Sequence, residues 1–76
     1  MENLKFKSYV FGNKITIYRK MRNMTQEQLA EKLDVSKQAI SKWENGKSFP
    51  RFELFIKVCK ELKMDLNDVI EILLNM

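Results

Sequence analysis

The chain has 76 residues, 45% of them hydrophobic, and its formal net charge is +4. This length suits one domain with a modest core, and the one cysteine excludes an intrachain disulfide, as is usual in a reducing cytoplasm. No run approaches the roughly 20 apolar residues that span a bilayer, and the first residues lack the apolar run of a signal peptide. We therefore expect a cytoplasmic protein that makes no contact with a membrane.

The sequence shows none of the residue arrangements that mark common active sites. The chain has no histidine, and its sequence contains no glycine-rich phosphate loop and no paired nucleophile and base. We therefore expect no enzymatic activity, no cofactor and no metal site.

Positive charge is concentrated in the N-terminal third of the chain. Residues 1–24 carry six Lys or Arg against one Glu, residues 25–48 carry four against four acids, and residues 49–76 carry four against five. Such an excess is expected where one face meets a polyanion, although an ordinary solvated surface would show it too.

Residues 1–10 are predicted to form an N-terminal arm, and residues 11–76 to form the folded domain. Apolar and polar residues alternate in the arm, which favours a short strand or an extended segment. From Phe11 the apolar spacing changes to that of a helix, with Ile15 and Tyr18 on the same face, and this helix is expected to end near Arg22.

Two short helices should follow the first one. Thr25 and Gln28 form a capping-box pattern that opens the second helix, whose inward residues are Leu29, Ala30 and Leu33. Ser36 is the expected N-cap of the third helix, and Asn45 with Gly46 should end it, because a left-handed residue is easily formed there.

The last two helices begin after Pro50 and at Asp65. The fourth should turn inward Phe52, Phe55, Val58, Cys59 and Leu62. The fifth carries Leu66, Val69, Ile70 and Leu73 on one face, and its further apolar residues extend the Val69 flank into an exposed stripe. Exposed stripes of this kind usually mark an interface, so we predict a homodimer contact through Val69, Ile72, Leu73 and Met76. A different protein partner or a missing neighbouring domain would also cover this stripe.

The second and third helices are joined by only Asp34, Val35 and Ser36, which is the arrangement of a helix-turn-helix. On a helical wheel of the third helix, Ala39, Ile40 and Trp43 face the core. The opposite face has no carboxylate and offers hydrogen-bond donors that suit the major groove of DNA. The predicted base-reading residues are Lys37, Gln38, Ser41 and Lys42, and the predicted contacts to the DNA backbone are Gln26, Ser36, Asn45, Lys47 and Ser48.

The segments Thr25 to Leu33 (TQEQLAEKL) and Ile40 to Gly46 (ISKWENG) resemble the Cro/CI-type, Xre-like or lambda repressor-like, helix-turn-helix domain. The resemblance extends from about Gly12 to Ile70 and implies an all-α fold of five helices, in which the second and third bind DNA. It also implies a largely buried salt bridge between Arg19 and Glu44, and a phosphate contact by Gln26. Three residues depart from the family pattern: Asn23 and Asp34 stand where glycine is common, and Lys63 stands where glycine or asparagine is usual.

Together these features predict a transcriptional repressor that binds a palindromic operator as a homodimer, with the third helix in the major groove of double-stranded DNA. The alternative is an interaction module that uses the same fold to bind another protein, as an antitoxin masks its toxin.

Overall fold

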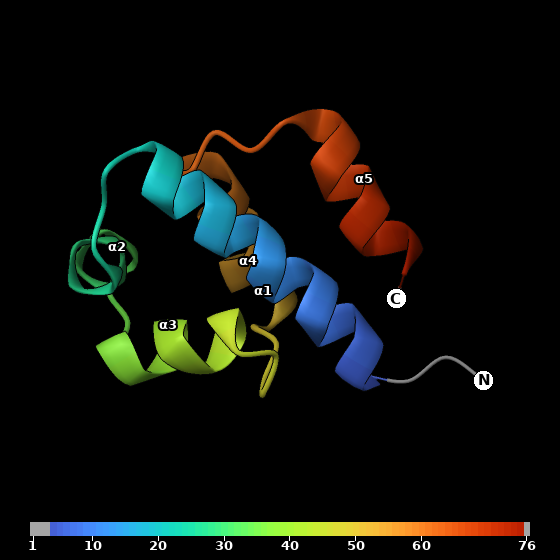
Figure 1. Cartoon of the computed structure of the whole chain (residues 1–76), viewed down its shortest axis with the longest axis horizontal. Coiled ribbons are helices and arrows are strands. Elements are labelled where there is room, and N and C mark those ends of the chain that lie inside the picture. The colour runs from blue at the N-terminus through green and yellow to red at the C-terminus, as the bar shows by residue number, and fades with distance from the viewer. Residues whose placement is uncertain (1–3, 76) are drawn as a thin grey trace.

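The computed structural model describes the backbone of residues 4–75 and the side chains of residues 9–75. Five helices follow one another: α1 (Leu4–Met21), α2 (Gln26–Leu33), α3 (Lys37–Glu44), α4 (Phe52–Glu61) and α5 (Leu66–Leu74). No strand occurs within residues 4–75, so the predicted all-α fold of five helices is confirmed. In Figure 1, α1 runs diagonally through the molecule with α2 and α3 on one side, α5 on the other and α4 behind it.

The prediction of an N-terminal arm is wrong over residues 4–10, because α1 begins at Leu4 and not at Phe11. An isolated strand would leave its backbone N–H and C=O groups without partners, whereas a helix pairs them within the segment. Extending an existing helix also avoids the costly nucleation step. Residues 1–3 of the predicted arm lie outside the described residues.

The core forms where α1 crosses the other helices. The Phe11 ring lies at its centre, 4.8 Å from the ring of Phe49 and 5.5 Å from that of Phe55, measured between centroids. The inward residues predicted for α2 and α3 are buried except Ala39, which is half-buried, and those predicted for α4 are buried except Phe52, which is 62% exposed. The buried hydrophobic residues are Phe11, Ile15, Leu29, Ala30, Leu33, Ile40, Trp43, Phe55, Val58, Cys59, Leu62, Met64 and Ile72.

The predicted helix caps are confirmed. Thr25 Oγ1 accepts a hydrogen bond from the Gln28 N–H, and Gln28 Oε1 accepts one from the Thr25 N–H, at 3.0 and 2.8 Å. The Ser36 hydroxyl accepts from the Ala39 N–H at 3.1 Å. The turns after α1, α2 and α4 each contain a non-glycine residue with positive φ: Asn23 (55°), Asp34 (58°) and Lys63 (53°).

The inward face of α5 differs from the prediction. Ile72 is fully buried and Val69 is half-buried, whereas Leu66 and Ile70 are 70% and 42% exposed. The placement of Ile72 on an exposed stripe is therefore wrong, because it belongs to the core of the single chain. Apolar residues surround this short helix on several sides, so periodicity alone cannot select the buried face. Met76 lies outside the described residues.

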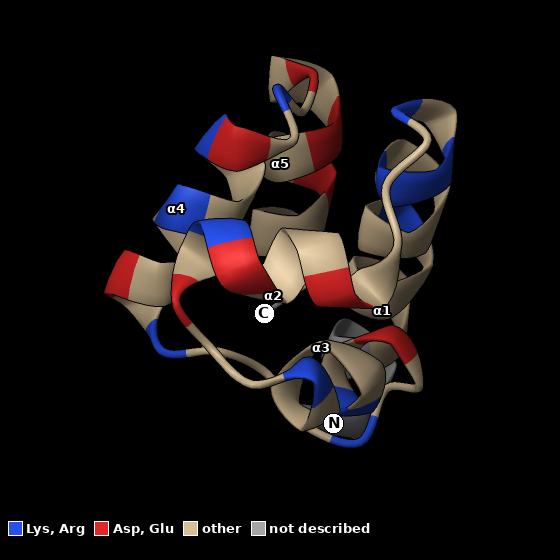
Figure 2. Ribbon diagram, turned by 90° about the vertical axis from the view of Figure 1, so that its left-hand side faces the viewer, with Lys and Arg blue, Asp and Glu red and all other residues tan. Residues whose placement is uncertain are grey.

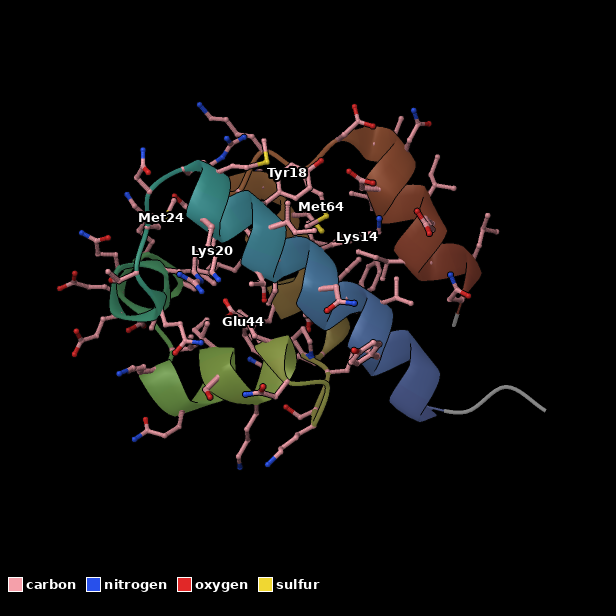
Figure 3. All side chains as sticks on the ribbon, viewed as in Figure 1. Lys14, Tyr18, Lys20, Met24, Glu44 and Met64 are labelled. Atoms are coloured by element: carbon pink, nitrogen blue, oxygen red, sulfur yellow. The ribbon has the colours of Figure 1, made fainter. Side chains whose placement is uncertain are left out.

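Polar contacts from α1 select that face. The Tyr18 hydroxyl donates to the Asp68 carboxylate and accepts from the Asp65 N–H at 2.9 Å. Lys14 Nζ lies 3.0 Å from Asp68 Oδ1 and 3.1 Å from Glu71 Oε1, and Figure 3 shows Lys14 and Tyr18 on the side of α1 that is turned toward α5. The hydrogen bond from Tyr18, and then the one from Lys14, hold the pKa of Asp68 below its ordinary value.

This lowered pKa predicts a specific dependence of stability on pH. The folded-state pKa lies below the unfolded value of about 3.9, so the stabilisation is complete above that pH and is lost as the pH falls through the folded pKa. Asp68→Asn should therefore lower the free energy of unfolding at neutral pH, and its difference from the wild type should shrink on acidification. Urea unfolding at several pH values measures this. Glu31→Gln, which removes an exposed carboxylate, is the control, and a pH-independent difference for Asp68→Asn would contradict the prediction.

Candidate nucleic-acid interface

The turn between α2 and α3 sets the direction of α3. Asp34 adopts the left-handed conformation at φ 58° and ψ 46°, and its backbone N–H donates to the carbonyls of Ala30 and Glu31, which ends α2. The Val35 N–H donates to the Ala30 carbonyl at 3.0 Å, and the Val35 side chain packs on the core. This compact turn makes α3 cross α2 instead of lying antiparallel to it, as a helix-turn-helix requires.

The outer face of α3 is a row of free donors. Ile40 and Trp43 are buried, while Lys37, Gln38 and Lys42 are exposed and form no hydrogen bond or ion pair with any residue that the structure describes. In Figure 3 the side chains along this face of α3 project away from α1. A helix with free donors and no competing carboxylate can present them to the acceptors of base edges in a major groove.

Two other predicted contact residues on α3 are bonded to each other. Asn45 Nδ2 donates to the Ser41 carbonyl at 2.9 Å and lies 3.4 Å from Ser41 Oγ. Ser41 is half-buried and Asn45 is exposed. The Asn45 amide nitrogen is therefore already hydrogen-bonded to Ser41 at the end of the helix.

The predicted backbone contacts lie at both ends of the helix-turn-helix. Ser36 is exposed at the start of α3, where its oxygen already caps the helix. Lys47 is exposed and Ser48 is half-buried in the segment after α3. In Figure 2, Lys residues mark α3 at the lower end of the molecule, and the acidic residues of α2 lie above it. The structure thus brings the predicted α3 residues and the following loop to one end of the molecule.

Gln26 lies at the junction of α2 and α3. Its Nε2 donates to Glu44 Oε1 at 2.9 Å, a contact that the sequence did not suggest. One amide hydrogen is therefore held inside the protein, and the other is available for a phosphate oxygen. This bond joins the start of α2 to the end of α3.

Arg19 and Glu44 form a bidentate ion pair that joins α1 to α3. Arg19 Nε lies 2.6 Å from Glu44 Oε2 and Arg19 Nη2 lies 3.1 Å from Glu44 Oε1. The third guanidinium nitrogen, Nη1, donates to the Met24 carbonyl at 2.7 Å. The two side chains are only 10% and 7% exposed, and Figure 3 shows Glu44 between α1 and α3.

A close backbone contact accompanies this ion pair. A Cβ atom on Gly12 would lie 2.3 Å from the Trp43 carbonyl oxygen and 2.9 Å from that of Glu44. Only glycine therefore lets α1 approach the end of α3 this closely. In the sequence, the indication of this close packing was a glycine directly after the predicted inward residue Phe11.

The predicted interface residues of α5 lie away from this surface. Val69 is half-buried, Leu73 is 38% exposed and Ile72 is buried. In Figure 1, α5 and α3 lie on opposite sides of α1. Any contact through α5 would therefore leave the outer face of α3 open.

Three further features of the described residues bear on the type of protein. None of the helices in the described part of the chain is long and apolar enough to cross a membrane. Among the described side chains, no group of three or more His, Cys, Asp or Glu residues could hold a metal ion. Burial raises the pKa of the Cys59 thiol to about 11, so this cysteine is protonated at neutral pH.

Comparison with known proteins agrees with this geometry. A family model described as helix-turn-helix matches residues 15–69. The chain is 42% identical over 60 residues to the HTH-type transcriptional activator BcrR of Enterococcus faecalis. The matched stretch covers 79% of this chain but only 29% of that protein. The chain is also 42% identical over 57 residues to the uncharacterised HTH-type transcriptional regulator MJ0272 of Methanocaldococcus jannaschii, covering 75% and 86% of the two chains. No solved structure matches.

Proposed function

The chain belongs to the Cro/CI-type helix-turn-helix family of DNA-binding transcriptional regulators, and from this we propose that it is a repressor that binds a palindromic operator as a homodimer. The outer face of α3 carries the proposal, because Lys37, Gln38 and Lys42 are exposed donors without partners among the residues that the structure describes. In the proposed complex this face lies in the major groove, where Gln pairs with adenine and Lys reaches guanine acceptors or phosphate.

Contacts to the DNA backbone would fix the register of α3 on either side of the groove. Gln26 and the free N–H groups at the start of α2 suit one phosphate, since a helix N-terminus attracts anions. Lys47 and Ser48 suit another after α3. These contacts carry no base information, but they supply affinity that falls as salt is added.

The homodimer is proposed through α5. Leu73 and Val69 remain candidates, and the exposed residues Leu66, Ile70 and Leu74 take the place that Ile72 was predicted to fill. A two-fold contact is self-complementary, so one apolar helix face can serve both subunits. The two copies of α3 would then reach successive major grooves about 34 Å apart.

Repression is proposed because a dimer that occupies promoter DNA needs no contact beyond its DNA interface. Activation, the role that the name of the Enterococcus relative gives, requires a further contact with another protein. Transcription from a promoter that carries the selected operator, with and without the protein, distinguishes the two roles: less transcript supports repression and more transcript overturns it.

The first test is selection of bound sequences from a random pool of duplex DNA at near-physiological salt. A two-fold symmetric site with half-sites about one helical turn apart is expected. Enrichment of single half-sites would keep the DNA-reading role and reject the dimer. No enrichment would favour a protein-binding module, in which a different protein covers the exposed apolar residues of α5, and a monomeric mass of the purified chain would agree with that.

Gln38→Ala tests base reading directly. We expect specific affinity to fall by roughly 1–3 kcal/mol, with relaxed base preference at one position of each half-site. The matched control is Lys47→Ala, which should weaken binding to operator and random DNA alike and reduce the salt dependence. Binding isotherms on operator, single-base variants and random duplexes measure both. Equal losses on all sequences for Gln38→Ala would reject its base-reading role.

A further inference from the structure

The attachment of α5 rests on few apolar contacts. Of the apolar residues in this nine-residue helix, only Ile72 is fully buried and Val69 is half-buried, whereas Leu66 and Leu74 are 70% and 80% exposed. Val69 and Ile72 are three residues apart and lie on the same side of the helix. Apolar packing is non-directional, so two neighbouring contacts leave α5 free to rotate and shift about them.

Directional contacts from α1 remove this freedom. Lys14 and Tyr18 are one helical turn apart, and together they bind Asp65, Asp68 and Glu71, which lie three residues apart along the start of α5. The Tyr18 hydroxyl uses its hydrogen for the Asp68 carboxylate and an oxygen lone pair for the Asp65 N–H. Hydrogen bonds weaken steeply when they are bent, so these four contacts define both the rotation and the axial position of α5.

α1 also holds α3, the helix proposed to read the DNA bases. Arg19, the residue after Tyr18, is bonded to Glu44 at the end of α3, and Gly12 lies against the carbonyls of Trp43 and Glu44. These anchors are on the opposite side of α1 from Lys14 and Tyr18, as the positions of α3 and α5 in Figure 1 indicate. α1 therefore connects α5 rigidly to α3.

We propose that Lys14, Tyr18 and Asp68 are positioning residues that set the separation of the two reading helices, and so the spacing between operator half-sites that the protein accepts. This inference rests on the homodimer through α5 proposed above. In the proposed dimer each α3 lies about 17 Å from the two-fold axis, half of the ~34 Å separation. A rotation of α5 by about 10° would therefore move α3 by about 3 Å, close to the ~3.4 Å rise of one base pair.

Tyr18→Phe is the cleanest variant, because it removes both hydrogen bonds of the hydroxyl and keeps the half-buried ring. The exposed residue Asp65 can turn its N–H to water, so the fold should tolerate the change. Tyr9→Phe is the matched control: it lies on the same helix, is 59% exposed, and its hydroxyl bonds no residue that the structure describes.

The experiment has two readouts. Hydrogen exchange of the DNA-free protein should show α5 amides exchanging about tenfold faster in Tyr18→Phe, with the amides of α2 and α3 unchanged. Binding is then measured on the selected half-sites, placed at the selected spacing and at spacings one base pair longer and shorter. The wild type should prefer its own spacing by about tenfold or more, and Tyr18→Phe should lose most of that preference while binding a single half-site normally.

Each result decides something. Faster exchange in α5 together with relaxed spacing supports the proposal, and Lys14→Arg, which keeps the charge, should then retain the wild-type preference better than Lys14→Met. Unchanged exchange overturns the role of Tyr18 in holding α5. Faster exchange with an unchanged spacing preference overturns the link to the operator. If the wild type binds only single half-sites, the homodimer fails and the spacing role fails with it, while hydrogen exchange still reports separately whether Tyr18 holds α5.

Discussion

Glu44→Gln is expected to lower the free energy of unfolding by about 3 kcal/mol, the largest effect of any single substitution considered for this chain. Glu44 accepts two hydrogen bonds from Arg19 and one from Gln26, and its side chain is 7% exposed. Removing its charge leaves the Arg19 guanidinium, which is 10% exposed, without a counter-ion in a poorly solvated site. Breaking one partner of such a pair costs more than the pair itself contributes.

The control is Glu53→Gln, which neutralises a carboxylate in an ion pair with Arg51 at 3.7 Å. Both side chains of that pair are more than 80% exposed, so the effect should be close to zero after screening by solvent. Denaturant unfolding of the two variants measures the contrast. A second test replaces both partners with apolar residues, as in Arg19→Met with Glu44→Leu, which should recover part of the loss. Equal and small effects of Glu44→Gln and Glu53→Gln would mean that the ion pair is well solvated.

Gly12→Ala is expected to lower the free energy of unfolding by about 2 kcal/mol, although Ala is the better helix former. Helix propensity alone predicts a gain of about 1 kcal/mol for this change. The new Cβ atom would lie 2.3 Å from the Trp43 carbonyl oxygen, and since that neighbour is backbone, one helix must move. Overpacking of this kind costs roughly 1–3 kcal/mol, and we expect it to exceed the gain in propensity.

Asn13→Ala is the matched control for Gly12→Ala. Asn13 lies next along α1 and is exposed, so the same propensity argument applies without the clash, and a gain of about 0.5 kcal/mol is expected. Thermal unfolding of both variants shows whether the two changes have opposite signs. Stabilisation by Gly12→Ala would mean that α1 can move away from α3 at little cost. Because Arg19 is on the same helix, the destabilised variant should also bind operator DNA less well.

The local features of the sequence predicted the middle of the molecule well. The capping box at Thr25 and the cap at Ser36 bound α2 and α3 where expected, because a cap depends on residues within one turn of each other. Asp34 stands where the family pattern favours glycine, and it adopts the left-handed conformation. Trp43 and Cys59 were assigned to the core by helical spacing and are buried. The base-reading roles of Lys37, Gln38 and Lys42 stay predictions until DNA binding is measured.

The N-terminal segment and the start of α4 were predicted less well, for two different reasons. At the N-terminus, an alternating pattern suggested an arm, but with no partner strand in the described residues the backbone pairs internally and α1 begins at Leu4. In α4, Phe52 has helical spacing relative to Phe55 yet is 62% exposed, since it is the first residue of the helix and lies at the edge of the core.

By itself the sequence determined α2 and α3, their caps, the turn between them, and the face of α3 that is free of carboxylates, since all of these depend on residues close together in the chain. Only the tertiary structure decided which face of α5 is buried and which groups connect the helices. Lys14 and Tyr18 reach α5 across more than 45 residues of chain, with separations of 54 and 50 to Asp68, and Gln26 reaches Glu44 across 18. Periodicity within one helix carries no information about such partners, because their geometry exists only after α1 has packed between α3 and α5.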